Sequence, residues 1–151
     1  MSESSTAKTK RKIIKAMQTY QPVQLTSFYF NEEDEPAIVL KAFSLIRKSI
    51  SAAFPDVTLI WWLRGKLLQG QVVPMFQIFS SDHLDRGRLQ NIIDRCDIDL
   101  VLRFKQFNRS QAKIDKWCST INSQKLHNLS QVYGKERIRR FAITNKPTYT
   151  Q

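Results

Sequence analysis

The sequence predicts an α+β fold with a four-stranded antiparallel sheet and two helices on one face. Residues 57–81, VTLIWWLRGKLLQGQVVPMFQIFSS, hold two apolar runs separated by glycine-bearing polar residues, as in a β-hairpin. A helical pattern lies on each side of this hairpin, and a short strand pattern lies beyond each helix. The resulting order, strand–helix–strand–strand–helix–strand, is that of ferredoxin-like folds.

Before the hairpin, the sequence predicts two helices with a strand between them. Residues 10–20, KRKIIKAMQTY, predict a short helix that must dock or bind something to be stable. Residues 24–30, QLTSFYF, predict the first strand. After Pro36, apolar residues recur at steps of three and four and form one helical face: Val39, Phe43, Ile46, Ile50 and Ala53.

The hairpin itself is predicted as strands 57–64 and 72–79 around a loop at 65–71, because Gly, Lys and Gln interrupt the apolar pattern there. Ser81 or Asp82 is the expected cap of the next helix. That helix would bury its apolar side, which consists of Leu89, Ile92, Ile93 and Cys96.

Clean alternation predicts the last strand of the unit over 97–107. Leu100, Leu102 and Phe104 would face the helices, so that Arg103 and Lys105 lie on the opposite, open face of the sheet. We expect Trp62, Arg64 and Gln77 on that face as well, with one of the neighbours Trp61 and Trp62 buried and the other exposed. A third helix is predicted over 108–126, with the stripe Ile114, Trp117 and Ile121.

We divide the chain into a basic N-terminal extension at 1–20, a ferredoxin-like core at 21–107, and a C-terminal helix with a basic tail at 108–151. Its 24 Lys and Arg exceed its 13 Asp and Glu, which gives a net charge of +11. The excess lies at the two ends, with +4 over 1–20 and +9 over 101–151, whereas residues 21–100 carry −2. Such asymmetry favours a polyanionic partner, most often nucleic acid.

Several other classes are disfavoured by composition. No segment reaches the roughly 20 apolar residues of a membrane span, and residues 1–12 lack the apolar centre of a secretory signal. Two cysteines and two histidines at unrelated spacings predict neither a disulfide framework nor a zinc site. We therefore expect a cytoplasmic protein that binds no membrane, no metal and no cofactor.

Two nucleic-acid-binding families have this topology. The RNA-recognition motif shares aromatic residues at Phe76 and Phe79, but its basic–Gly–aromatic opening is missing here. The chain resembles the HUH replication initiators of filamentous phages and prophages more closely, over about 57–142. The matching residues are Trp62-Leu63-Arg64-Gly65, then Gly70, then Pro74-Met75-Phe76-Gln77, and in the tail Tyr133, Lys135 and Arg139-Arg140-Phe141-Ala142.

The resemblance implies a site in which two histidines hold a divalent metal and a tyrosine attacks DNA. This chain carries Met75 and Gln77 at the histidine positions, and a thioether with a neutral amide is a poor ligand set for a hard cation. His83 and His127 lie elsewhere. The resemblance, together with this departure, implies a nicking fold that has lost nicking and kept binding.

We therefore predict a non-enzymatic DNA-binding protein of a mobile element (plasmid or phage), acting in transcription regulation or as an accessory factor in replication or transfer. Phosphate contact is assigned to the basic ends, and any sequence preference to Trp62, Arg64 or Gln77. The full set of expected nucleic-acid-binding residues is Lys10, Arg11, Lys12, Lys15, Trp62, Arg64, Lys66, Gln77, Arg103, Lys105, Arg109, Lys113, Arg137, Arg139 and Arg140.

Two alternatives stay open. The chain could be a metal-dependent nicking initiator that uses Tyr133 or Tyr149 as its nucleophile. It could also be an RNA-binding or protein-interaction module, with the open sheet face forming a homodimer. The sequence favours DNA over RNA and does not specify a target site.

Overall fold

The structure is a computed structural model, which describes residues 5–30, 36–68, 70–96, 100–119, 121 and 141–146. Within these ranges, the side chains of residues 5, 6, 36, 37, 65–68 and 71–74 are not described. The described elements are α1 (Ser5–Tyr20), β1 (Gln24–Phe30), α2 (Pro36–Ala53), β2 (Leu59–Leu68), β3 (Gln71–Ser80), α3 (Arg86–Arg95), β4 (Leu100–Gln106), α4 (Gln111–Ser119) and β5 (Phe141–Thr144).

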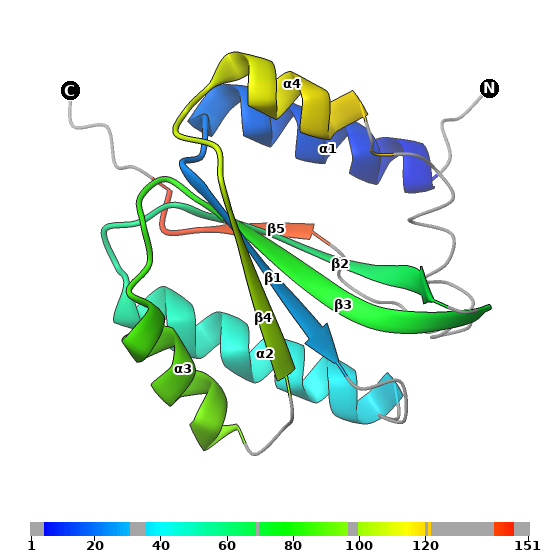
Figure 1. Cartoon of the computed structure of the whole chain (residues 1–151), viewed down its shortest axis with the longest axis vertical. Helices are drawn as coiled ribbons and strands as arrows, with labels where there is room; N and C mark the ends of the chain where they lie inside the picture. The colour runs from blue at the N-terminus through cyan, green and yellow to red at the C-terminus, as the bar shows by residue number, and fades with distance from the viewer. Residues whose placement is uncertain are drawn as a thin grey trace.

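The protein has an α+β fold, in which the described strands form one antiparallel sheet with the order β4-β1-β3-β2-β5 (Figure 1). The prediction of four strands is wrong, because β5 adds a fifth strand beside β2. Its pairing runs from Leu59 opposite Thr144 to Trp62 opposite Phe141. A four-residue strand is too short for alternation to reveal it, and the sequence analysis assigned Phe141 to the basic tail.

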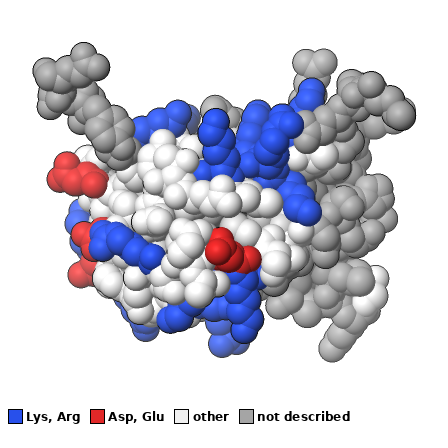
Figure 2. Space-filling model, turned by 90° about the horizontal axis from the view of Figure 1, so that it is seen from above, with Lys and Arg blue, Asp and Glu red and all other residues white. Residues whose placement is uncertain are grey.

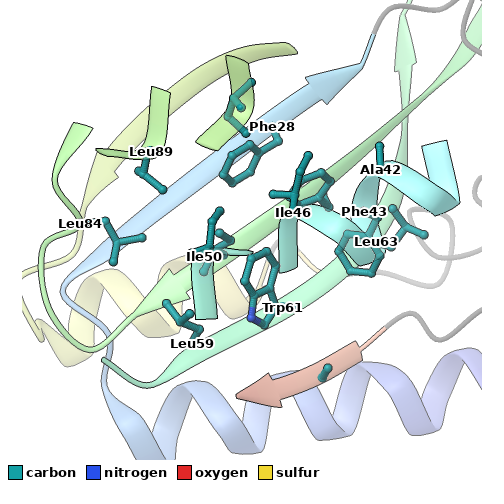
Figure 3. Close-up of a cluster of buried hydrophobic side chains, with 14 of the residues drawn as sticks. Phe28, Ala42, Phe43, Ile46, Ile50, Leu59, Trp61, Leu63, Leu84 and Leu89 are labelled. Carbon is teal, nitrogen blue, oxygen red and sulfur yellow. The ribbon is translucent and has the colours of Figure 1, made fainter. Parts of the chain in front are cut away.

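One face of the sheet packs against α2 and α3, as predicted. The inward stripe of α2 packs against residues of β2 that face it, including Leu59, Trp61 and Leu63 (Figure 3). Phe76 lies at the centre of this core, stacked on Phe28 with ring centroids 4.4 Å apart and in edge contact with Phe43 at 5.0 Å. The alternation predicted for β4 is confirmed, because Leu100, Leu102 and Phe104 are half-buried whereas the residues between them are exposed.

The other face is not open, and this corrects the prediction. Helices α1 and α4 lie across it, so that the molecule has three layers with the sheet in the middle (Figure 1). Trp62 is fully buried there in edge contact with Trp117. The ring centroid of Phe79 lies 4.5 Å from that of Trp117. Both Trp61 and Trp62 are therefore buried, on opposite faces. The physical reason is that β2 and β3 are apolar on both sides, as strands covered on both faces are.

Helix α1 packs on this second face through Ile13 and Met17, both fully buried. Its position is linked to that of α4 by the loops at one end. The backbone N–H groups of Phe107 and Asn108 donate to the carbonyl oxygen of Val23, at 2.7 and 2.9 Å. These bonds join the β4–α4 connection to the α1–β1 connection, so α1 and α4 are anchored to one another as well as to the sheet.

Several predicted element boundaries are wrong, including the start of α1 at Ser5 rather than residue 10. The hairpin loop is shorter than 65–71, because β2 continues to Leu68 and pairs Gly65 with Pro74, and Gly70 at φ 81° supplies the turn. The N-cap of α3 is Asp85, whose carboxylate accepts the Arg88 N–H at 2.9 Å. The Ser81 hydroxyl instead accepts the Thr58 N–H.

The start of α4 also differs from the prediction. This helix begins at Gln111 rather than 108, because Asn108 and Arg109 have φ values of 53° and 57° and cannot be part of a right-handed helix. The predicted stripe Ile114, Trp117 and Ile121 is buried as expected. The predicted helix ran to residue 126, whereas α4 ends at Ser119 and Ile121 is not helical; residues 122–126 lie outside the described residues.

Candidate nucleic-acid interface

The outward side of α1 carries a continuous row of cations. The helix contains five basic and no acidic residues. Lys8, Arg11, Lys12 and Lys15 occupy positions i, i+3, i+4 and i+7, which share one helical face, and all four are exposed. Ile13 and Met17 are buried on the opposite face. Docking α1 on the sheet therefore holds these four residues, which we call the α1 stripe, on the molecular surface.

Helix α4 lies beside α1 and runs in the opposite direction (Figure 1). The amide of Gln21, next to the end of α1, donates to the Oε1 of Gln111 at the start of α4, at 3.1 Å. Because Ile114 and Trp117 face inward, Lys113 and Lys116 lie on the exposed side, together with Asp115. The structure thus brings basic residues from both ends of the chain into one helical layer.

The edge strand β4 extends this basic surface. Arg103 and Lys105 are exposed and lie on the α1/α4 side of the sheet, as the alternation predicted. The Lys105 ammonium lies 5.9 Å from the centre of the Phe107 ring. The guanidinium of Arg109 donates to the carbonyl oxygen of Ser81 at 3.1 Å, which holds it against the sheet. Figure 2 shows the molecule from the α1/α4 side, where Lys and Arg cover more of the described surface than Asp and Glu do.

A hollow of about 390 Å³ lies against α1. Among the described residues, its lining combines the cations Lys10, Arg11 and Lys15 with the apolar Ala7 and Ile14. Cations attract phosphate oxygens, and an apolar floor accepts a sugar or base. The hollow is therefore chemically suited to part of a nucleic-acid chain.

Trp62 and Gln77 are not available for base contact, contrary to the prediction. They face the α1/α4 layer, where Trp62 is fully buried and Gln77 is 5% exposed. The Trp62 Nε1 donates to the Gln77 Oε1 at 2.7 Å, and the Gln77 Nε2 donates to the Ser27 hydroxyl at 3.0 Å. A buried amide needs such partners, and both the oxygen and the nitrogen of the Gln77 side chain are bonded inside the protein.

Arg64 is two residues after Trp62 on β2, so it lies on the same face of the sheet as Trp62 and Gln77. It is half-buried, and its guanidinium carbon lies 5.4 Å from the centre of the Trp62 ring. Burial lowers the pKa of Arg64, an effect that nearby Tyr29 opposes. The guanidinium remains charged at neutral pH, because its unperturbed pKa is so high.

Other predicted residues lie outside the described part of the chain. Arg137, Arg139 and Arg140 belong to this group, as do the candidate nucleophiles Tyr133 and Tyr149, and Lys66 is described only in its backbone. Lys8 is not among the predicted residues, because the predicted helix begins at residue 10. The i, i+3, i+4, i+7 spacing of lysine and arginine from residue 8 is the signal that could have identified it.

The residues present do not fit the metal site that the HUH resemblance implies. Met75 is 1% exposed, and the Gln77 oxygen already accepts a hydrogen bond. In the described part of the chain, no group of three or more His, Cys, Asp or Glu could hold a metal ion.

Comparisons with protein-family models, with curated proteins and with solved structures found no match to this chain. Among the described residues, no helix is long and apolar enough to cross a membrane. The function must therefore be argued from the side chains and their arrangement.

Proposed function

We propose that this chain is a non-enzymatic DNA-binding protein of a mobile element, acting in transcription regulation or as an accessory factor in replication or transfer. It contacts phosphates through the outer surface of α1, α4 and the edge strand β4. The observation that carries this proposal is the α1 stripe, a row of four exposed cations on a helix without acidic residues.

The dimensions of the stripe suit a duplex. Lys8 and Lys15 are seven residues apart, which corresponds to about 10 Å along a helix. Duplex DNA presents one charge per roughly 1.7 Å of its axis, so about six phosphate charges lie along that length. Lys113 and Lys116 on α4 widen the same surface, so more than one phosphate row is within reach.

The fold supports the proposal in a second way. Strands β4-β1-β3-β2, with α2 and α3 on one face, are consistent with a ferredoxin-like core to which α1, α4 and β5 are added. In that arrangement the layer added on the second face carries the cations, and the positions of the implied metal ligands are filled by Met75 and Gln77. The cations on the second face and the absence of metal ligands at Met75 and Gln77 both support DNA binding without cleavage.

The experiment is a titration of labelled duplex DNA at several salt concentrations with the wild-type protein and two double variants. Lys12→Gln/Lys15→Gln neutralises two members of the α1 stripe. Lys41→Gln/Lys48→Gln is the matched control, because it removes two exposed lysines from α2 in the opposite layer. Each lost phosphate contact should lower the slope of log K against log salt concentration by about one.

We expect the first double variant to lose about two units of slope and to bind duplex more weakly, and the control to match the wild type. Equal weakening by both variants would show general charge attraction rather than a site. A wild-type affinity that does not change with salt would refute the proposal. A denaturing gel of the same mixtures with Mg²⁺ tests the enzymatic alternative, since nicking through a tyrosine leaves a covalent adduct.

A further inference from the structure

The guanidinium of Arg64 holds one of the three buried side-chain polar atoms that lack a hydrogen-bond partner in the described part of the chain, beside Thr26 Oγ1 and Gln106 Oε1. Its Nε atom is buried and has no hydrogen-bond partner. None of its five N–H groups donates to another described residue, and the contact that is present is with the face of the Trp62 ring. Leaving a buried donor unpaired is unfavourable, and more so when the group is charged.

Arg64 is nevertheless held in a defined environment. The ring beneath it cannot swing away, because Trp62 is anchored through Gln77 to Ser27 and wedged against Trp117. A buried chain of three polar groups thus fixes the surface on which the guanidinium lies. An aromatic ring under an arginine favours its charged form and orients its planar fork.

Tyr29 lies on the same face. The registers place Tyr29 opposite Met75 and Met75 opposite Arg64, so the two longer side chains flank a buried thioether. The interaction with Tyr29 opposes the lowering of the Arg64 pKa by burial. Beyond it on β4 lie Val101, which is 56% exposed, and Arg103, which is exposed. Towards this end β1 and β4 diverge from α1 and α4 (Figure 1).

We propose that Arg64 binds a phosphoryl group on this part of the sheet, with Tyr29 beside it and with the Trp62 ring as its platform. A phosphate oxygen pair would satisfy the buried Nε and a second guanidinium N–H, neither of which has a partner among the described residues, since arginine binds phosphate in a bidentate manner. If the phosphate belongs to a nucleic-acid backbone, the inference rests on the proposed function. A free phosphate or phosphorylated small molecule has the same chemistry and is the second source to be tested.

The first experiment is thermal unfolding of the full chain at pH 7 in chloride and in about 10 mM phosphate, at matched ionic strength. A ligand that binds only the folded state raises the melting temperature, by roughly 3 °C when its concentration is about ten times Kd. We expect this rise in the wild type and its loss in Arg64→Met. In chloride alone, Arg64→Met should melt no lower than the wild type, because it removes a buried donor that has no partner.

Two further variants make the result specific. Arg86→Met is the control, because Arg86 also lies over an aromatic ring, that of Phe104 at 4.3 Å, but on the other side of the sheet and exposed. It should keep the phosphate response. Arg64→Lys keeps the charge without the planar fork and should lose most of the response. An equal phosphate response in the wild type and both Arg64 variants would overturn the inference.

A titration with a labelled single-stranded oligothymidylate then identifies the source of the phosphate. If Arg64→Met binds the oligonucleotide about tenfold more weakly than the wild type, the site belongs to a nucleic-acid backbone. A loss of about tenfold is what removal of one charged hydrogen-bonded pair should cause. An Arg64-dependent response to phosphate with unchanged oligonucleotide affinity assigns it to a small phosphorylated ligand. The α1 stripe variants test the proposed function separately, because Lys12 and Lys15 lie on the outer side of α1, away from Arg64.

Discussion

Trp62 and Gln77 are joined by a 2.7 Å hydrogen bond inside the layer between the sheet and helices α1 and α4. The two residues come from adjacent strands and lie directly opposite one another in the β2–β3 register. Gln77 in turn donates to Ser27 on β1, so a single polar chain crosses three strands in an apolar layer. This chain explains why Gln77 occupies a buried position that an apolar residue could fill.

We expect Gln77→Leu to destabilise the protein by about 2 to 3 kcal/mol, because the Trp62 N–H and the Ser27 hydroxyl both lose a buried partner. Urea denaturation followed by far-UV circular dichroism measures the change. Gln90→Leu is the control, since the exposed amide of Gln90 bonds only Asp94 one turn away, at 2.8 Å, and its loss should cost no more than about 0.5 kcal/mol. Equal stability of the two variants would contradict the role given to Gln77.

Helix α1 is expected to be part of the cooperative fold. Met17→Ala should lower the free energy of unfolding by about 2 to 4 kcal/mol, because Met17 is fully buried against the second face. Ile38→Ala on α2, where the side chain is 46% exposed, should cost less than about 1 kcal/mol. If Met17→Ala were as mild as Ile38→Ala in the same urea titration, α1 would be a loosely attached arm.

Substitution of Asp82 and of Asp85 tests which of the two aspartates caps the N-terminus of α3. Asp85→Ala should cost about 1 kcal/mol, because it removes the acceptor of the Arg88 N–H at the helix start. Asp82→Ala should change stability by less than about 0.5 kcal/mol, since Asp82 accepts only the N–H of its exposed neighbour His83. The reverse order of the two losses would place the cap where the sequence analysis had put it.

The two cysteines should be poorly reactive at neutral pH. Burial raises the pKa of the Cys118 thiol, and the nearby carboxylate of Asp115 raises it further. Burial also raises the pKa of Cys96. A raised pKa leaves less thiolate at a given pH, so the rate of alkylation by iodoacetamide should rise at higher pH than it does for a free cysteine.

Cys118 reports on the α1/α4 layer, because it is buried in that layer on α4. Its alkylation, located by mass spectrometry, should accelerate in Met17→Ala, whereas alkylation of Cys96 on the other side should not. Equal acceleration at both sites would indicate that the whole protein loosens rather than one layer.

The sequence by itself determined the α+β class, the central hairpin and the inward stripe of α2, because each depends on a local period of apolar residues. It also determined that the charge lies at the two chain ends. The alternation of β4, with Arg103 and Lys105 facing away from α2 and α3, was predictable for the same reason.

Only the tertiary structure decided what covers the second face of the sheet. The burial of Trp62 and Gln77, the pairing of β5 with β2, and the placing of α1 beside α4 all join residues far apart in the chain. No local period encodes such contacts. A basic, amphipathic helix has the same sequence pattern whether its apolar side docks on its own protein or on a partner. Here α1 docks on its own protein, because strands β2 and β3 are apolar on both faces and provide the surface.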